Sequence, residues 1–328
     1  MLNSQLQQLK NSNSSYKKPH LSFEKQLEHL KSKGLIVPNE AYALKKLSHL
    51  NYYRLSAYSL NFKYPKESEK ADDFYEGTEF REIIQLYDFD AKLRRLIFGV
   101  LETIEVYIRT QIAYVHTSNY EAFGYLEDEN FQCNREDFEK LMKDIKSESK
   151  RSDEKFIKHF KNKYNSTDLP LWSVVEVLSL GTVSRLFSLL KVDDKKEIVK
   201  DIGVHQKVFQ NWLHALTIVR NMCAHHSRTW NKQLRIQFAI PTKNLQFEPI
   251  RKITKKRFSN GKMQDREYDN KSSIFFALSV IKYILDSIGE EVDFVEELKD
   301  LLNSHPNIDK NSMGFVDKWE KLDIWSNV

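Results

Sequence analysis

The segment RNMCAHHSRTW, residues 220–230, brings together side chains suited to acid–base chemistry on a phosphate. Arginine carries a permanent charge and a forked set of donors that match phosphate oxygens. Histidine exchanges a proton near neutral pH, and an asparagine can orient an imidazole or bind an oxygen. Arg220, Asn221 and His225 therefore suit cleavage of an RNA phosphodiester without a metal ion. In such a reaction the 2′-hydroxyl attacks its own phosphate and the arginine offsets the developing charge.

The element that must position these residues is a helix predicted at about residues 206–229. On a wheel of about 100° per residue, an apolar stripe marks its core face. His226 falls on this stripe, which indicates a buried structural histidine that supports the site. Arg220 and His225 lie about 140° apart and do not converge on one ideal helix. Either the helix distorts, or another element completes the site, or two copies of the helix meet. The stripe holds Trp212, Ala215, Leu216, Val219, Met222 and Cys223.

The apolar periodicity elsewhere predicts an all-α fold with one small β-hairpin. A long helix is predicted at about 79–117, and shorter helices at 22–35, 38–58, 135–163, 169–190 and 271–303. A short strand is expected at 234–241, and a hairpin at 253–268 turns around Asn260-Gly261. Two sets of residues are expected to be buried: Phe23, Leu27, Leu30 and Leu35 in the first helix, and Leu86, Phe89, Leu93, Ile97, Val100, Ile104, Ile108 and Ile112 in the long one.

The domain organisation follows from these elements. We expect a flexible polar arm at 1–20 and an N-terminal helical region at 21–78. A helical core follows at 79–303, with the hairpin inserted at about 234–268. A tail at 304–328 carries aromatic residues that pack back on the core.

Composition bounds the class of protein. With 41% hydrophobic and 30% charged residues in 328, the composition is that of a globular protein. A formal net charge of +5 is too small to establish a nucleic-acid partner, so local patches must decide. Two cysteines, a polar start and no apolar run of about eighteen residues predict a cytoplasmic protein without a signal peptide or membrane span.

Several residues have two interpretations. Glu105 and Arg109 are spaced for a helix-stabilising ion pair, but an acid here could also orient the catalytic arginine, and Glu102 and Glu176 compete for that role. Cys223 beside the histidines could suggest a metal, but no ligand pair with zinc spacing accompanies it, so packing is favoured and we expect no metal or other cofactor. A nucleotidyl-transfer function lacks a glycine-rich nucleotide loop.

Basic residues define a second possible RNA contact. The segment RKITKKRFSNGK is either a solvated hairpin or a surface that contacts the RNA backbone. Arg54 lies among tyrosines that either stack on unpaired bases or are buried at a helix junction. The candidate RNA-binding residues are Arg251, Lys252, Lys255, Lys256, Arg257, Lys262, Arg54 and Arg228.

These blocks resemble a known family. Arg220-Asn221-x-x-x-His225 matches the R-N-x3-H form of the HEPN ribonuclease motif, and RNMCAHHSRTWN looks like the signature of the Abi-like (AbiD/AbiF) abortive-infection proteins. LNYYRLSAY (50–58), GTEFREIIQLYDFDAKLRRLI, LPLWSVVEVLSLGTVSRLF and the MGF…W…W tail resemble further blocks of that family. The likeness covers about residues 18–325, and Thr229 replaces a usual leucine.

The resemblance implies a HEPN-type helical bundle with an N-terminal helical extension. It implies a phage-defence toxin that acts as an endoribonuclease, with Arg220, Asn221 and His225 as catalytic residues, supported by Glu105, Arg109 and His226. It further implies a homodimer with a composite site and a structured non-coding RNA that restrains the toxin. The alternative is a non-catalytic RNA-binding scaffold that forms a stable ribonucleoprotein.

Overall fold

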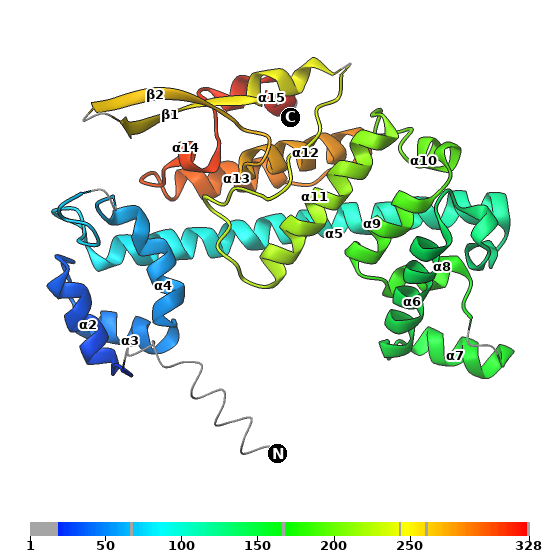
Figure 1. Cartoon of the computed structure of the whole chain (residues 1–328), viewed down its shortest axis with the longest axis horizontal. Coiled ribbons are helices and arrows are strands. Elements are labelled where there is room, and N and C mark those ends of the chain that lie inside the picture. The colour runs from blue at the N-terminus through cyan, green and yellow to red at the C-terminus, as the bar shows by residue number, and fades with distance from the viewer. Residues whose placement is uncertain (1–18, 66–67, 166–167, 243, 260–261, 327–328) are drawn as a thin grey trace. The chain divides into compact units, whose positions relative to one another are not determined.

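The computed structural model describes residues 19–65, 68–165, 168–242, 244–259 and 262–326. Within them the fold is all-α with one two-stranded antiparallel hairpin (Figure 1), which confirms the predicted fold class. The chain divides into two compact units, one that ends at Asp88 and one that runs from Phe89 to Val328. The predicted arm at 1–20 lies outside the described residues except for its last two.

The first unit consists of short helices, each opened by a polar N-cap. Ser22, Asn39 and Asn51 each accept a backbone hydrogen bond from the first turn of their helix, as capping requires. Phe23, predicted to be buried, is exposed, because it begins its helix one full turn before the first buried residue, Leu27. The elements are α2 Phe23–Ser32, α3 Glu40–His49, α4 Tyr52–Ser59, η1 Leu60–Phe62 and the beginning of α5.

Helix α5, Phe80–Tyr120, is the long helix that the sequence predicts. All eight positions expected on its core face are buried, from Leu86 to Ile112, which confirms the periodicity. At about 1.5 Å per residue the helix is roughly 60 Å long. Its residues from Phe89 onward belong to the second unit.

The next two predicted helices are both interrupted. Residues 135–163 form two helices, since the chain is extended at Ser152. Residues 169–190 form α8, a 3-10 turn and α9, because Leu178 is extended and Ser179 begins a new helix by accepting a hydrogen bond from the Thr182 N–H. The elements are η2 Gly124–Leu126, η3 Asp128–Asn130, α6 Arg135–Arg151, α7 Lys155–Tyr164, α8 Leu171–Val174, η4 Val175–Val177 and α9 Leu180–Leu189.

The hairpin prediction is confirmed, and the strand prediction at 234–241 is wrong. Strands β1 Lys252–Ser259 and β2 Lys262–Asp269 pair antiparallel, and the turn residues 260–261 lie outside the described residues. Residues 234–241 pair with no β-strand. Their N–H groups donate instead to backbone carbonyls outside strands and to a side chain; Ala239, for example, donates to Asn211 Oδ1. The preceding elements are α10 Val192–Ile198, α11 Gln206–Ala224 and η5 Leu245–Ile250.

The C-terminal segment completes the core of the second unit. Trp325 is fully buried, stacks on Phe275 at 5.6 Å and donates a hydrogen bond from its indole to Ser279 Oγ, so this residue packs against α12. Asn311 of α14 donates to the Thr254 carbonyl of β1, and Figure 1 shows the hairpin next to this helix. The elements are α12 Ile274–Ser287, α13 Phe294–Asn303, α14 Lys310–Met313, η6 Trp319–Lys321 and α15 Asp323–Ser326.

Candidate active site

Helix α11 ends earlier than the sequence predicts. Ala224 is its last residue, and His226 adopts a left-handed conformation with φ of 53°. The His226 N–H donates to the Cys223 carbonyl and the Ser227 N–H to the Met222 carbonyl, the two bonds of a Schellman helix end. Histidine is among the residues that adopt positive φ more often than most. The predicted helix of 206–229 is therefore five residues too long.

The early end changes the environment of the two histidines. His225 is the C-cap and is exposed. His226, predicted to be buried on the apolar stripe, is also exposed, because the wheel no longer applies beyond Ala224. Asn221 is exposed one turn before His225. The predicted stripe itself is buried, apart from the half-buried Met222.

A buried carboxylate holds the chain that follows the helix. Asp90 of α5 accepts hydrogen bonds from the N–H of Trp230 at 2.7 Å and of Thr229 at 3.1 Å. Arg94 donates to Asp90 at 2.6 Å and to the Ser227 carbonyl at 3.2 Å, which links the same segment to α5 a second time. These bonds fix where the chain runs after His225.

Sequence reasoning missed this pair. The signal was a charged residue on the apolar stripe of α5, directly after the predicted core position Phe89. Thr229, the departure from the family pattern, is buried, and its hydroxyl donates to the Ser227 carbonyl. A threonine at this position therefore contributes a hydrogen bond to the segment that Asp90 holds.

The Arg220 side chain contacts two residues of another helix, α5. The Oε2 atom of Glu105 lies 3.5 Å from Arg220 Nε, at ion-pair distance but without hydrogen-bond geometry. Phe98 supports the guanidinium from below, with Cζ 5.5 Å from the ring centre. Asn221 Oδ1 lies 3.5 Å from Nη1, a long contact. The Arg220 side chain remains 28% exposed, so solvent reaches part of the guanidinium.

Glu105 is shared between two arginines. It is 7% exposed and pairs with Arg109 on its own helix as well as with Arg220. Arg109 also donates to the Leu178 carbonyl at 2.6 Å, at the break before α9. Both interpretations of the Glu105–Arg109 spacing thus correspond to contacts in the structure. The competing acids, Glu102 and Glu176, are exposed.

Arg220 and His225 do not meet within one copy of the chain. Among the residues that the structure describes, no hydrogen bond or ion pair joins the two side chains. One carboxylate between two guanidiniums leaves a net positive charge beside Arg220, which favours an anion. The arrangement can bind a phosphate at Arg220 and move a proton at His225. Both can act on one phosphate only if another element or a second copy of the chain brings these two side chains together.

The predicted RNA-binding residues are dispersed over the chain. Acids lie beside two of them, with Glu248 3.6 Å from Arg251 and Glu267 2.5 Å from Lys252. Burial lowers the pKa of Lys255, and Asp309 opposes that shift. Arg54 and Arg228 are half-buried, in α4 and in the segment after α11. The side chains of Lys256, Arg257 and Lys262 lie outside the described residues.

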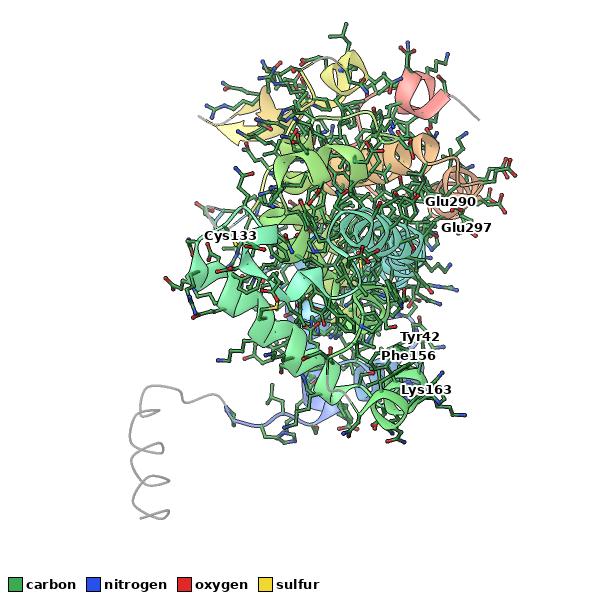
Figure 2. All side chains as sticks on the ribbon, turned by 90° about the vertical axis from the view of Figure 1, so that its right-hand side faces the viewer. Tyr42, Cys133, Phe156, Lys163, Glu290 and Glu297 are labelled. Atoms are coloured by element: carbon green, nitrogen blue, oxygen red, sulfur yellow. The ribbon has the colours of Figure 1, made fainter. Side chains whose placement is uncertain are left out.

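Cys223 is placed for packing. It is buried, and burial raises the pKa of its thiol to about 12, so it is protonated near neutral pH. Cys133 is half-buried elsewhere in this unit (Figure 2). The described residues contain no group of three or more His, Cys, Asp or Glu side chains arranged to hold a metal ion. Nor do they contain a helix long and apolar enough to cross a membrane.

Comparison with known proteins gives one match. A family model described as Abi-like protein matches residues 45–231, which include α5 and the whole of RNMCAHHSRTW. No curated protein matches the chain, and no solved structure does.

Proposed function

This chain belongs to the Abi-like protein family of abortive-infection, phage-defence proteins, and from that premise we propose that it is a HEPN-type, metal-independent endoribonuclease. The observation that best supports this proposal is the ion pair between Arg220 and Glu105. A buried carboxylate from α5 orients a guanidinium that solvent still reaches, one turn before an exposed histidine. An arginine with a partly exposed guanidinium is suited to bind a phosphate, whereas an arginine with a purely structural role would need no exposure.

The proposed reaction uses the RNA's own 2′-hydroxyl. His225 accepts the hydroxyl proton, the 2′-oxygen bonds to the adjacent phosphorus, and the bond from phosphorus to the 5′-oxygen breaks. That oxygen takes up a proton from water and leaves as a 5′-hydroxyl, while the phosphate remains as a 2′,3′-cyclic ester. Arg220 offsets the extra negative charge on the phosphoryl oxygens. Asn221, on the exposed side with His225, orients the RNA or the imidazole.

We further propose that two copies form a composite site. Arg220 and His225 are about 7.5 Å apart along the helix axis and about 140° apart around it. A second copy of the chain can place its His225 beside Arg220 of the first copy, and its Arg220 beside His225 of the first copy. Exposed apolar side chains of α5 near Glu105 support this arrangement, because Phe98 and Val106 are 39% and 52% exposed and lie about 80° apart around the helix.

The experiment compares RNA-free wild type with His225→Ala on labelled RNA in EDTA. His29→Ala, an exposed histidine of α2, serves as the matched control. We expect wild type and the control to give 2′,3′-cyclic phosphate and 5′-hydroxyl ends, and His225→Ala to give none. Equal cleavage by His225→Ala would remove the proposed role of that residue.

The same preparations test the non-catalytic alternative. RNA that co-purifies as one defined species and stays intact with every variant would favour a stable ribonucleoprotein. Loss of cleavage on adding that species back to active protein would instead support restraint of the nuclease by a structured RNA, as the resemblance implies.

A further inference from the structure

An open polar groove lies between α9 and α11, apart from the cluster around Arg220. Its volume is about 760 Å³, and its walls include Gly181 and Ser184 of α9 and Lys207, Gln210 and His214 of α11. At Gly181 an added Cβ would lie 3.7 Å from Thr217 of α11, an ordinary contact distance. The two helices therefore pack closely at the floor, and the absence of a larger side chain keeps the groove open.

The α11 wall of the groove belongs to an acid-free part of the chain, while Asp144 of α6 lines the other side and pairs with Arg185. From Ile202 to Phe247 the sequence contains no aspartate or glutamate, while Lys207, Arg220 and Arg228 lie within this span. Acidic side chains gather elsewhere in the second unit. Glu290 and Glu297, for example, project outward near α13 (Figure 2). The formal charge of α11 itself is thus positive, although the net charge of the whole chain is small.

Some polar side chains of the groove are hydrogen-bonded within the protein, and others are not. Ser179 and Thr182 both donate to Glu148 of α6, and Arg185 is paired with Asp144. The Lys207 ammonium and the His214 ring, in contrast, have no hydrogen bond or ion pair to any described residue. A cation and an imidazole that face an open groove without a protein partner are available to an anionic ligand.

The groove is continuous in sequence with the candidate active site. Asn221 of α11 lies seven residues after His214, and His225, the C-cap of α11, lies eleven residues after it; both spacings return to one side of a helix. Over eleven residues the helix rises roughly 16 Å. A polymer that runs along this side of α11 therefore passes from the groove to Asn221 and His225.

We propose that the groove between α9 and α11 binds the sugar–phosphate backbone of single-stranded RNA and guides the strand to His225; this inference rests on the proposed ribonuclease function. A groove whose unpaired charge is positive, and whose other walls are polar, follows a backbone without reading the sequence. A single strand is required because attack by the 2′-hydroxyl needs it in line with the departing 5′-oxygen, which a regular duplex does not allow. Lys207 contacts a phosphate, and Gln210 and His214 contact phosphate or ribose oxygens.

The test measures RNA binding separately from cleavage. In full-length protein carrying His225→Ala, the affinity for a labelled single strand of about twelve nucleotides is followed by fluorescence anisotropy over a range of salt. Lys207→Gln is expected to lower the affinity about fivefold to tenfold at low salt. The slope of log affinity against log salt concentration should become shallower by about one, as expected for the loss of one phosphate contact. Gly181→Trp, which fills the groove, is expected to weaken binding further. Lys321→Gln, an exposed lysine of η6, is expected to change little.

The outcomes separate this inference from the proposed function. Unchanged affinity and salt slope in Lys207→Gln and Gly181→Trp would overturn the groove assignment, even if wild type cleaves RNA. Equal affinity for a duplex of the same length would overturn the single-strand assignment. Weakened binding in both variants, together with a wild type that never cleaves, would support the groove and reject the nuclease. Melting curves matching wild type confirm that both variants are folded.

Discussion

Glu105 on α5 lies with its Oε2 atom 3.5 Å from the Nε atom of Arg220 on α11. The carboxylate is itself fixed, because it also pairs with Arg109, which donates to the Leu178 carbonyl at 2.6 Å. Three elements thus determine where Glu105 points. The consequence is a fixed carboxylate at ion-pair distance from the Nε side of the Arg220 guanidinium.

Replacing this carboxylate should affect turnover more than binding. Glu105→Gln keeps the shape but removes the charge that orients Arg220, and a misplaced catalytic group costs on the order of a hundredfold in rate. We expect kcat for RNA cleavage to fall by about that factor while KM changes little. Glu102→Gln, an exposed residue of the same helix, should retain wild-type kinetics. Equal kcat in both variants would assign Glu105 a structural role only.

A composite site predicts complementation between two inactive variants. Arg220→Ala and His225→Ala should each be inactive alone. If one copy supplies Arg220 and the other His225, each mixed dimer keeps one intact site, so a mixture should regain about a quarter of wild-type activity. The measurement is the cleavage rate after the two proteins are mixed and allowed to exchange subunits. No recovery, with exchange confirmed by mass, would contradict a site shared in this way.

The predictability of the fold differs from element to element for physical reasons. The core face of α5 could be predicted from the sequence, because its apolar residues recur at helical spacing and all fall on one side of the helix. The break at Leu178 could not, because the run LPLWSVVEVLSL is predominantly apolar and contains no glycine or proline near Leu178. The Arg109 side chain bonds the free carbonyl there, and such a tertiary contact leaves no local pattern.

The candidate site shows the same division. The spacing of Arg220, Asn221 and His225 predicted a site there, and the wheel predicted that an element beyond α11 contributes; in the structure Glu105 of α5 lies beside Arg220. The helix end escaped prediction because neither glycine nor proline follows Ala224. His226 takes the left-handed position instead, and Asp90, far away in the sequence, holds the segment after it.

Asp90 should therefore be essential for stability. Asp90→Ala leaves the N–H groups of Thr229 and Trp230 and the charge of Arg94 without their acceptor in a buried place. Losing one partner of a buried ion pair costs about 3–5 kcal/mol of the free energy of unfolding. Urea denaturation measures this loss.

The control for Asp90 is two residues away. Asp88→Ala removes a carboxylate that is half exposed and 3.9 Å from Lys46, and such a pair contributes about 0–1 kcal/mol. A similar small loss in Asp90→Ala would show that the segment after α11 does not depend on this carboxylate.

His116 should make stability depend on pH. The residue is fully buried between Tyr120 and Phe131, with ring centres 4.7 and 5.3 Å away. Burial lowers the pKa of His116 below its ordinary value of 6.5, and the charge of Asp194 only partly opposes this.

The sign follows from proton binding. As pH falls through 6.5, the unfolded chain binds a proton at this position while the folded protein does not, so the free energy of unfolding decreases until the lowered folded-state pKa is reached. His116→Phe should remove that component, giving a smaller loss of stability than wild type between about pH 7.5 and about pH 5.5. Urea titrations at both values measure it, with His29→Ala as the control for losing a histidine at an exposed position. Identical pH dependence in wild type and His116→Phe would mean that His116 is protonated equally in the folded and unfolded chain, and burial would then not control its charge.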